Sequence, residues 1–188
     1  PIPTEVTEHI IKRTDGVPLY VEEMMKAVLE ARVLEEDRGQ LVLAAPLDTL
    51  PIPETLQDSL MARLDRLGQA KDVAQIASVI GREFTYKLLR EVVPFEEEPL
   101  QRELKQLVES ELIFQRGRFP RAKFLFKHAL VQDTAYESLL RRHRQEWHGK
   151  IAESLIEKFE DTAAAEPELI ARHFDEAGRT EEAVDWWL

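Results

Sequence analysis

The sequence of 188 residues lacks cysteine altogether, contains only seven glycines, and has no long apolar run. Without cysteine the chain forms no disulfide bond and offers no thiolate ligand to a metal ion. No stretch approaches the roughly 20 apolar residues that a membrane-spanning helix requires. Hydrophobic residues make up 44% and charged residues 32% of the chain, which is the balance of a globular protein. We therefore expect a cytoplasmic protein without a membrane partner.

Complete catalytic signatures are absent as well. The sequence has no phosphate-binding loop G-x-x-x-x-G-K-[ST], no dinucleotide-binding G-x-G-x-x-G and no nucleophile elbow G-x-S-x-G. His143 and His148 lie five positions apart, whereas helical zinc ligands prefer spacings of three or four, which share one face. Acidic runs such as 35–37 and 96–98 are typical of solvated loops. The sequence thus predicts a segment without a catalytic residue, metal site or cofactor of its own.

Charge is distributed unevenly along the chain. The formal net charge of −11 argues against nucleic-acid binding over the whole surface. Residues 116–150, in contrast, carry nine Lys or Arg against three acidic residues. Any contact with phosphate groups is therefore expected in this part of the chain.

Apolar periodicity predicts a mainly α-helical fold with a small β-hairpin, divided into parts 1–49, 50–127 and 128–188. In the first part, Asp15-Gly16 is expected to end one helix and Pro18 to begin the next.

Two features lie at the C-terminal end of the first part. Short apolar runs on both sides of Asp37-Arg38-Gly39 predict a small hairpin. Residues 46–53 contain three prolines, and the helical conformation is disfavoured for the residue before each proline. We expect a domain boundary there and regard this segment as a candidate hinge.

In the second part, several helices precede two short apolar runs, 112–114 and 124–126, joined by a turn-rich basic loop. Helices followed by a two-stranded hairpin are the order of a winged helix, with the hairpin as the wing. The wing cations that are candidates for contacts with nucleic acid or phosphate are Arg116, Arg118, Arg121 and Lys123. The expected recognition helix, 97–105, alternates acids and bases, so we expect a protein or nucleotide partner rather than nucleic acid.

The third part is entirely helical in pattern. Residues 169–187 have the form helix, short glycine turn, helix, as at the start of a tetratricopeptide-like array. One such repeat cannot bury its own apolar face, so more repeats should follow. The sequence also begins without methionine and ends at Trp186-Trp187-Leu188 within an apolar helical pattern. We expect a segment of a longer protein.

Several stretches, taken in order and spacing, resemble a bacterial family of AAA-related signal-transduction ATPases (STAND-type). Many members of this family carry a class III adenylate/guanylate cyclase domain at the N-terminus. The matching stretches are 14–23, 52–67, 80–84, 126–136 and 171–174.

The resemblance implies an order of ATPase core, helical lid, winged helix and helical-repeat sensor array. The chain would hold the end of the lid (1–49), the winged helix (50–127) and the start of the array (128–188). ATP or ADP with magnesium would bind in the parent protein. The implied partners are the upstream ATPase core and output domain of the same chain, and a protein or small-molecule signal at the array.

The resemblance also implies residues near the nucleotide. Gly16-Val17-Pro18 matches the family's G-x-P motif, which lies beside the nucleotide base. His128 follows the second wing strand, where related switch ATPases place a histidine near the phosphates of ADP; an imidazole there donates to phosphate oxygen.

The expected function is thus regulatory, with the segment coupling the nucleotide state of the core to the array and the output domain. Two alternatives remain open. One is a DNA-binding winged-helix transcriptional regulator, and the other is a helical scaffold for protein–protein interaction.

Overall fold

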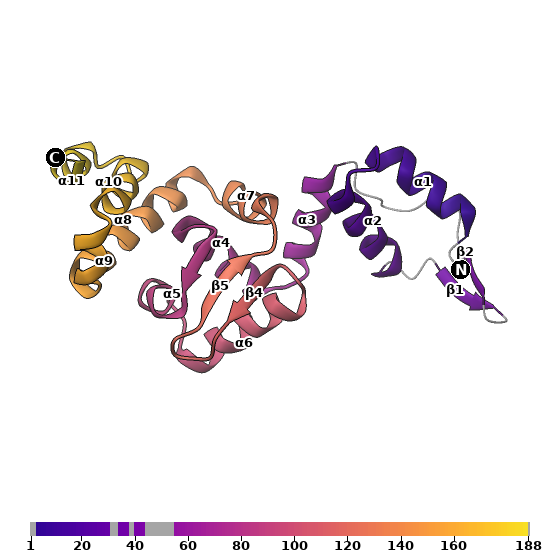
Figure 1. Cartoon of the computed structure of the whole chain (residues 1–188), viewed down its shortest axis with the longest axis horizontal. Coiled ribbons are helices and arrows are strands. Elements are labelled where there is room, and N and C mark those ends of the chain that lie inside the picture. Colours follow the sequence, from indigo (N-terminus) through magenta and orange to yellow (C-terminus); the bar gives the residue numbers. More distant parts are fainter. Residues whose placement is uncertain (1–2, 31–33, 38–39, 44–54, 188) are drawn as a thin grey trace. The chain divides into compact units, whose positions relative to one another are not determined.

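The computed structural model describes residues 3–30, 34–37, 40–43 and 55–187. The chain forms two compact units, Pro1–Arg63 and Leu64–Leu188. The described residues are mainly helical, with a two-stranded and a three-stranded antiparallel sheet (Figure 1). This confirms the expected fold class. The candidate hinge at 46–53 and the expected boundary between 49 and 50 lie outside the described residues, and the boundary between 127 and 128 stays a prediction.

The first unit is built on two helices, α1 (Thr4–Thr14) and α2 (Pro18–Glu30). Their core consists of the buried side chains Val6, Ile10, Met24 and Val28. These side chains recur at helical spacing, so each helix buries one apolar stripe against the other.

The expected hairpin is also present in the first unit. Strand β1 (Leu34–Asp37) pairs with β2 (Gln40–Leu43) in antiparallel register, with Leu34 opposite Leu43. Helix α3 (Leu56–Asp65) follows and reaches the boundary between the two units.

The second unit opens with helices and a small sheet. Their order is α4 (Gln69–Ile80), β3 (Glu83–Thr85), α5 (Tyr86–Val92), α6 (Glu97–Glu109), β4 (Ile113–Arg116) and β5 (Lys123–Phe126). The sheet has the order β3-β5-β4, so the last strand lies between the other two. The sequence indicated β structure only for the two hairpin strands. The sequence did not predict strand β3, because three residues are too few to show the alternation of apolar and polar side chains that is typical of a strand.

Alternation along β5 separates the two faces of this sheet. Phe124 and Phe126 are buried, whereas Lys123 between the turn and Phe124 is exposed. On the inner face the Phe84 ring stacks on Phe124 at a centroid distance of 5.5 Å and lies 5.8 Å from Phe126. These aromatic contacts join β3 to β5 and explain why so short a strand forms.

Five helices complete the second unit: α7 (Ala129–Glu137), α8 (Arg141–Lys158), α9 (Glu160–Ala165), α10 (Pro167–Glu176) and α11 (Thr180–Trp187). The long helix α8 packs against α4 and α5 on one side and against α10 on another, and α10 packs against α11. Helix α8 therefore connects the sheet-containing part of the unit to its C-terminal helices (Figure 1).

The turn between α10 and α11 depends on two residues. Gly178 has φ +76°, a left-handed conformation that glycine adopts most readily. Arg179 then forms ion pairs with Glu153 of α8 and Glu182 of α11, and these pairs raise the pKa of the guanidinium. Among the helices described, none combines the length and apolar character needed to cross a lipid bilayer.

Candidate functional site

The corner between α1 and α2 carries the first predicted nucleotide-proximal residues, Gly16 and Pro18. Asp15 and Gly16 are both left-handed, with φ of +48° and +71°, and Pro18 begins α2. No other atom lies within 4 Å of the position that a Cβ at Gly16 would occupy. Gly16 is therefore suited to the backbone angle rather than to close packing. Gly16, Val17 and Pro18 are all exposed, so the corner is a fixed and accessible surface feature.

His128, the third predicted residue, occupies the N-cap position of α7 but makes no side-chain capping bond. Its Nε2 atom is buried and has no hydrogen-bond partner. A buried imidazole nitrogen without a partner is an unfavourable arrangement that a bound group can relieve.

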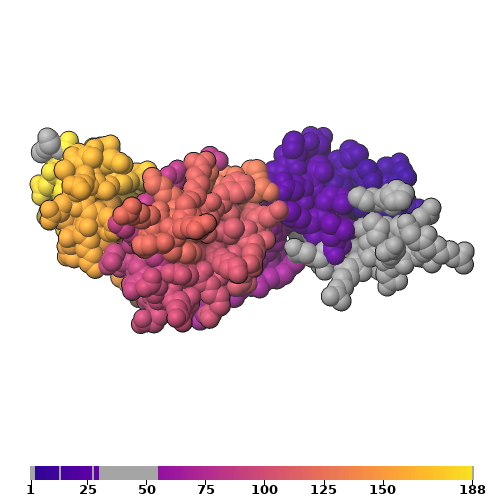
Figure 2. All heavy atoms as spheres, turned by 60° about the horizontal axis from the view of Figure 1, so that its bottom comes forward, coloured from indigo at the N-terminus to yellow at the C-terminus, as the bar shows by residue number. Residues whose placement is uncertain are grey.

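The four wing cations lie at the surface of the second unit. Arg116, Arg118, Arg121 and Lys123 are all exposed, and the hairpin that bears them is visible in the space-filling view (Figure 2). Arg116 is directly opposite Lys123 in the ladder, and the Lys123 Nζ lies 3.8 Å from Glu83. The structure thus brings the cations together as one exposed group.

Helix α6 would have to enter a DNA groove if the wing bound duplex. Its exposed side chains are Glu97, Glu98, Arg102, Lys105 and Glu109. Three carboxylates and two cations give this surface no positive excess. The wing cations therefore have no basic partner surface on α6.

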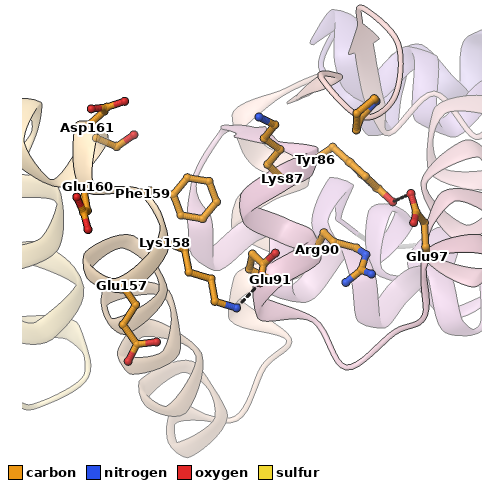
Figure 3. Close-up of a pocket in the computed structure, with 12 residues that line it drawn as sticks. Tyr86, Lys87, Arg90, Glu91, Glu97, Glu157, Lys158, Phe159, Glu160 and Asp161 are labelled. Atoms are coloured by element: carbon orange, nitrogen blue, oxygen red, sulfur yellow. Dashed lines mark hydrogen bonds and ion pairs between the residues drawn. The ribbon is translucent and has the colours of Figure 1, made fainter.

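An open cleft of about 810 Å³ lies between α5 and the junction of α8 with α9 (Figure 3). We call it the α5–α9 cleft. Its lining residues are Tyr86, Lys87, Arg90, Glu91, Glu97, Pro120, Glu157, Lys158, Phe159, Glu160, Asp161 and Thr162. A single ion pair, Lys158 with Glu91, crosses from α8 to α5. The cleft has the size of a small-molecule site.

A second cavity of about 810 Å³ borders a buried chain of polar groups on α7, α8 and α10. The Tyr136 hydroxyl lies 3.0 Å from His148 Nε2, and His148 Nδ1 lies 2.8 Å from His173 Nδ1. Because one Nδ1 must donate to the other, the tautomers of the two rings depend on each other. His148 is 5% exposed and His173 is fully buried.

Burial determines the charge of this histidine pair. Desolvation, with smaller contributions from Arg172 and Arg144, lowers the pKa of His148 from 6.5 to about 4. Desolvation, followed by the effects of His148 and Arg172, lowers the pKa of His173 to about 3. Burial and the nearby Glu176 raise the pKa of Tyr136. At neutral pH both imidazoles are uncharged.

Sequence reasoning missed this histidine pair, although a signal was present. His148 falls on the same helical stripe as Ile151 and Leu155, and His173 follows Ile170 by one turn. A histidine at a core-facing position indicates burial. That the two rings would meet across 25 positions depends on how α8 and α10 pack.

A second missed feature lies in the first unit. Glu23 on α2 is buried, 3% exposed, and forms an ion pair with Arg63 of α3. Lys26 lies 3.8 Å from the same carboxylate. Within the described ranges, no group of three or more His, Asp or Glu side chains is placed to hold a metal ion.

No family model matches the sequence. An uncharacterized protein of Rhizobium meliloti (strain 1021) is 32% identical to the chain over 186 residues. The alignment covers 98% of this chain and 17% of that protein. The chain thus spans less than a fifth of the length of this relative.

Proposed function

We propose that the chain is a non-catalytic regulatory segment of a larger signalling ATPase, in which it couples the nucleotide state of an upstream core to a helical sensor array and an output domain. One observation carries the proposal. The order helix, strand, helix, helix, strand, strand, with the sheet order β3-β5-β4, is followed by α7 and then by α8, which packs on α4 and α5. A shift of α8 would therefore move the sheet-containing part with it.

The proposed domain order follows that reading. Residues 50–127 form a winged helix with β4 and β5 as the wing, and the helix pair α10 and α11 begins a tetratricopeptide-like array. The long relative supports a multidomain setting, because this chain aligns with only a small share of it. We place the protein in the cytoplasm because it lacks cysteine.

Gly16, Pro18 and His128 are the residues that we assign to the edge of the nucleotide site. The exposed corner at Gly16 and Pro18 offers a fixed backbone to a base. The His128 Nε2 lacks a partner and is able to donate to a phosphate oxygen. ATP or ADP with magnesium would be held mainly by residues upstream of this chain.

Nucleotide binding tests the proposal directly. We expect ADP and magnesium-ATP to bind a longer chain that includes the preceding residues of the parent protein. The 188-residue chain should bind at least a hundredfold more weakly, because most of the site is missing. In the longer chain, His128→Ala should weaken binding about tenfold, the loss of roughly one charge-assisted contact. Pro18→Ala should also weaken binding about tenfold, because the corner at the start of α2 is then less rigid. Isothermal titration calorimetry measures all of these affinities.

The matched control is His143→Ala, since His143 is exposed on α8. This variant should bind nucleotide like the unaltered chain. If the longer chain binds no nucleotide, the ATPase assignment is wrong and the scaffold function becomes the better explanation.

The exposed wing cations favour one second candidate, a DNA-binding regulator, although the charges on α6 oppose it. We expect no saturable binding of a labelled DNA duplex in fluorescence anisotropy. For a DNA-binding protein, the logarithm of the binding constant would instead fall with the logarithm of the salt concentration, at a slope of about −0.9 per phosphate contacted. Such binding, if it is abolished by Arg118→Gln with Arg121→Gln, would establish the regulator. Lys105→Gln on α6 separates wing contacts from helix contacts.

A further inference from the structure

We infer that the α5–α9 cleft binds a small dipolar molecule, one that carries an anionic and a cationic group at opposite ends of a short apolar body. The inference rests on the proposed function only in naming this molecule as the signal that the segment receives. The site itself is argued from the residues of the second unit alone.

Apart from the ion pair between Lys158 and Glu91, the two walls of the cleft carry charges of opposite sign. On α5, Lys87 is exposed and Arg90 is half-buried. On the facing wall, Glu157 lies in the last turn of α8, while Glu160 and Asp161 begin α9. In Figure 3, Lys87 extends from α5 toward the side on which Phe159 and Asp161 lie.

These charges have no partners among the described residues. The described part of the chain provides neither a hydrogen bond nor an ion pair to the side chains of Lys87, Arg90, Glu157, Glu160 and Asp161. The neighbouring charges are engaged, because Lys158 pairs with Glu91. The cleft therefore holds unpaired cations on one wall and unpaired carboxylates on the other.

Contacts within the protein hold the α5 wall in place and tie it to the facing wall. The Tyr86 ring is 2% exposed, and its hydroxyl accepts a hydrogen bond from Gln101 Nε2 at 3.2 Å. Tyr86 also stacks edge-on against Phe119 at a centroid distance of 4.7 Å. The Lys158–Glu91 pair ties the walls together. A preorganised cleft of this kind loses little entropy when a ligand enters.

Phe159 supplies an apolar contact at the junction of α8 and α9. Its ring is half-buried and lies on the acidic side of the cleft (Figure 3). An ammonium group placed there meets carboxylates and an aromatic ring together, which is a favourable cation site. The anionic group of the same molecule would then reach Lys87, whereas Arg90 extends toward the side of α5 on which Glu97 lies (Figure 3).

The arrangement discriminates against molecules with one charge. A plain anion satisfies the α5 wall but leaves the carboxylates facing it, and a plain cation meets the reverse problem. A dipolar molecule satisfies both walls. Because α5 belongs to the sheet-containing part and α9 to the C-terminal helices, such a ligand would also join the two parts of the unit.

A series of dipolar probes tests the inference on the 188-residue chain. Glycine, γ-aminobutyrate, ε-aminocaproate and lysine vary the distance between ammonium and carboxylate. We expect at least one of them to bind saturably in calorimetry. The singly charged analogues caproate and hexylamine should bind at least tenfold more weakly than the best probe, since each lacks one charged contact.

Variants locate the site. Lys87→Gln and Asp161→Asn should each weaken binding of the best probe about tenfold, whereas Arg118→Gln on the wing should leave it unchanged. Circular dichroism confirms that each variant is folded. Because Lys87 and Asp161 have side chains at the surface of the cleft, neither change removes buried packing.

Three outcomes would overturn the inference: no probe binds, caproate or hexylamine binds as well as every dipolar probe, or the two cleft variants bind normally. Nucleotide binding by the longer chain is measured separately. If a dipolar probe binds here and the longer chain binds no nucleotide, the binding site is confirmed and only the ATPase assignment is wrong.

Discussion

Phe124→Ala is expected to lower the free energy of unfolding of the second unit by about 3–5 kcal/mol, the range observed when a buried aromatic ring is removed from a core. Phe124 is 1% exposed and lies on the central strand β5. Its ring stacks on Phe84 and lies 6.1 Å from Phe119. Alanine would leave a cavity in the inner face of the sheet, and β3 would lose the stacking of Phe84 on Phe124. Urea denaturation followed by circular dichroism measures the change.

The sheet provides its own control for this prediction. Phe114→Ala changes the same residue type on the neighbouring strand β4, where the ring is 47% exposed on the outer face. We expect the free energy of unfolding to fall by less than about 1 kcal/mol there, because folding buries little of the apolar surface of this side chain. Equal losses for the two variants would mean that the inner face of the sheet is not the core of this unit.

The second large effect is a loss of stability in mild acid, caused by the buried pair His148 and His173. Above pH 6.5 both imidazoles are neutral in the folded and in the unfolded chain, so the pair adds no pH dependence. Below pH 6.5 the unfolded chain takes up protons that the folded chain does not bind, because burial lowers both folded pKa values. The free energy of unfolding therefore decreases as pH falls, by about 1.4 kcal/mol per pH unit for each histidine.

The size of this effect follows from the pKa of His148. Between pH 6.5 and its folded pKa of about 4, His148 alone accounts for a loss of about 3 kcal/mol, and His173 acts in the same direction. Urea denaturation at several pH values in this window measures the slope. The double variant His148→Gln with His173→Gln should show a flatter dependence on pH than the unaltered chain.

His143→Gln is the matched control for the acid effect. His143 lies on the same helix but is exposed, so its replacement should leave the slope unchanged. If the double variant loses stability in acid as steeply as the unaltered chain, titrating carboxylates rather than the histidine pair govern the acid response.

Local patterns in the sequence were sufficient for much of the fold. The α1–α2 corner was predictable because Gly16 and Pro18 have strong conformational preferences of their own. The hairpin of β4 and β5 was predictable from two apolar runs around a glycine turn, although the strands extend to Arg116 and begin at Lys123 rather than at the expected positions. Strand β3 was not predictable, since its pairing partner lies about 40 positions further along the chain.

The candidate sites divide in the same way. The wing cations were visible in the sequence because they are close together along the chain. The α5–α9 cleft was not, because its walls come from residues 86–97 and 157–162 and meet only when α8 packs on α5. The histidine pair was also hidden, because each ring looked like an isolated polar residue on an apolar stripe.

The mainly helical class, the turns and the exclusion of disulfide chemistry thus follow from residue type and short-range spacing. Which charges remain unpaired, which imidazoles lose their water and which strands share the sheet depends instead on tertiary packing. Those properties arise from contacts between residues far apart in the chain. Their energies depend on burial and distance, which short-range patterns do not encode.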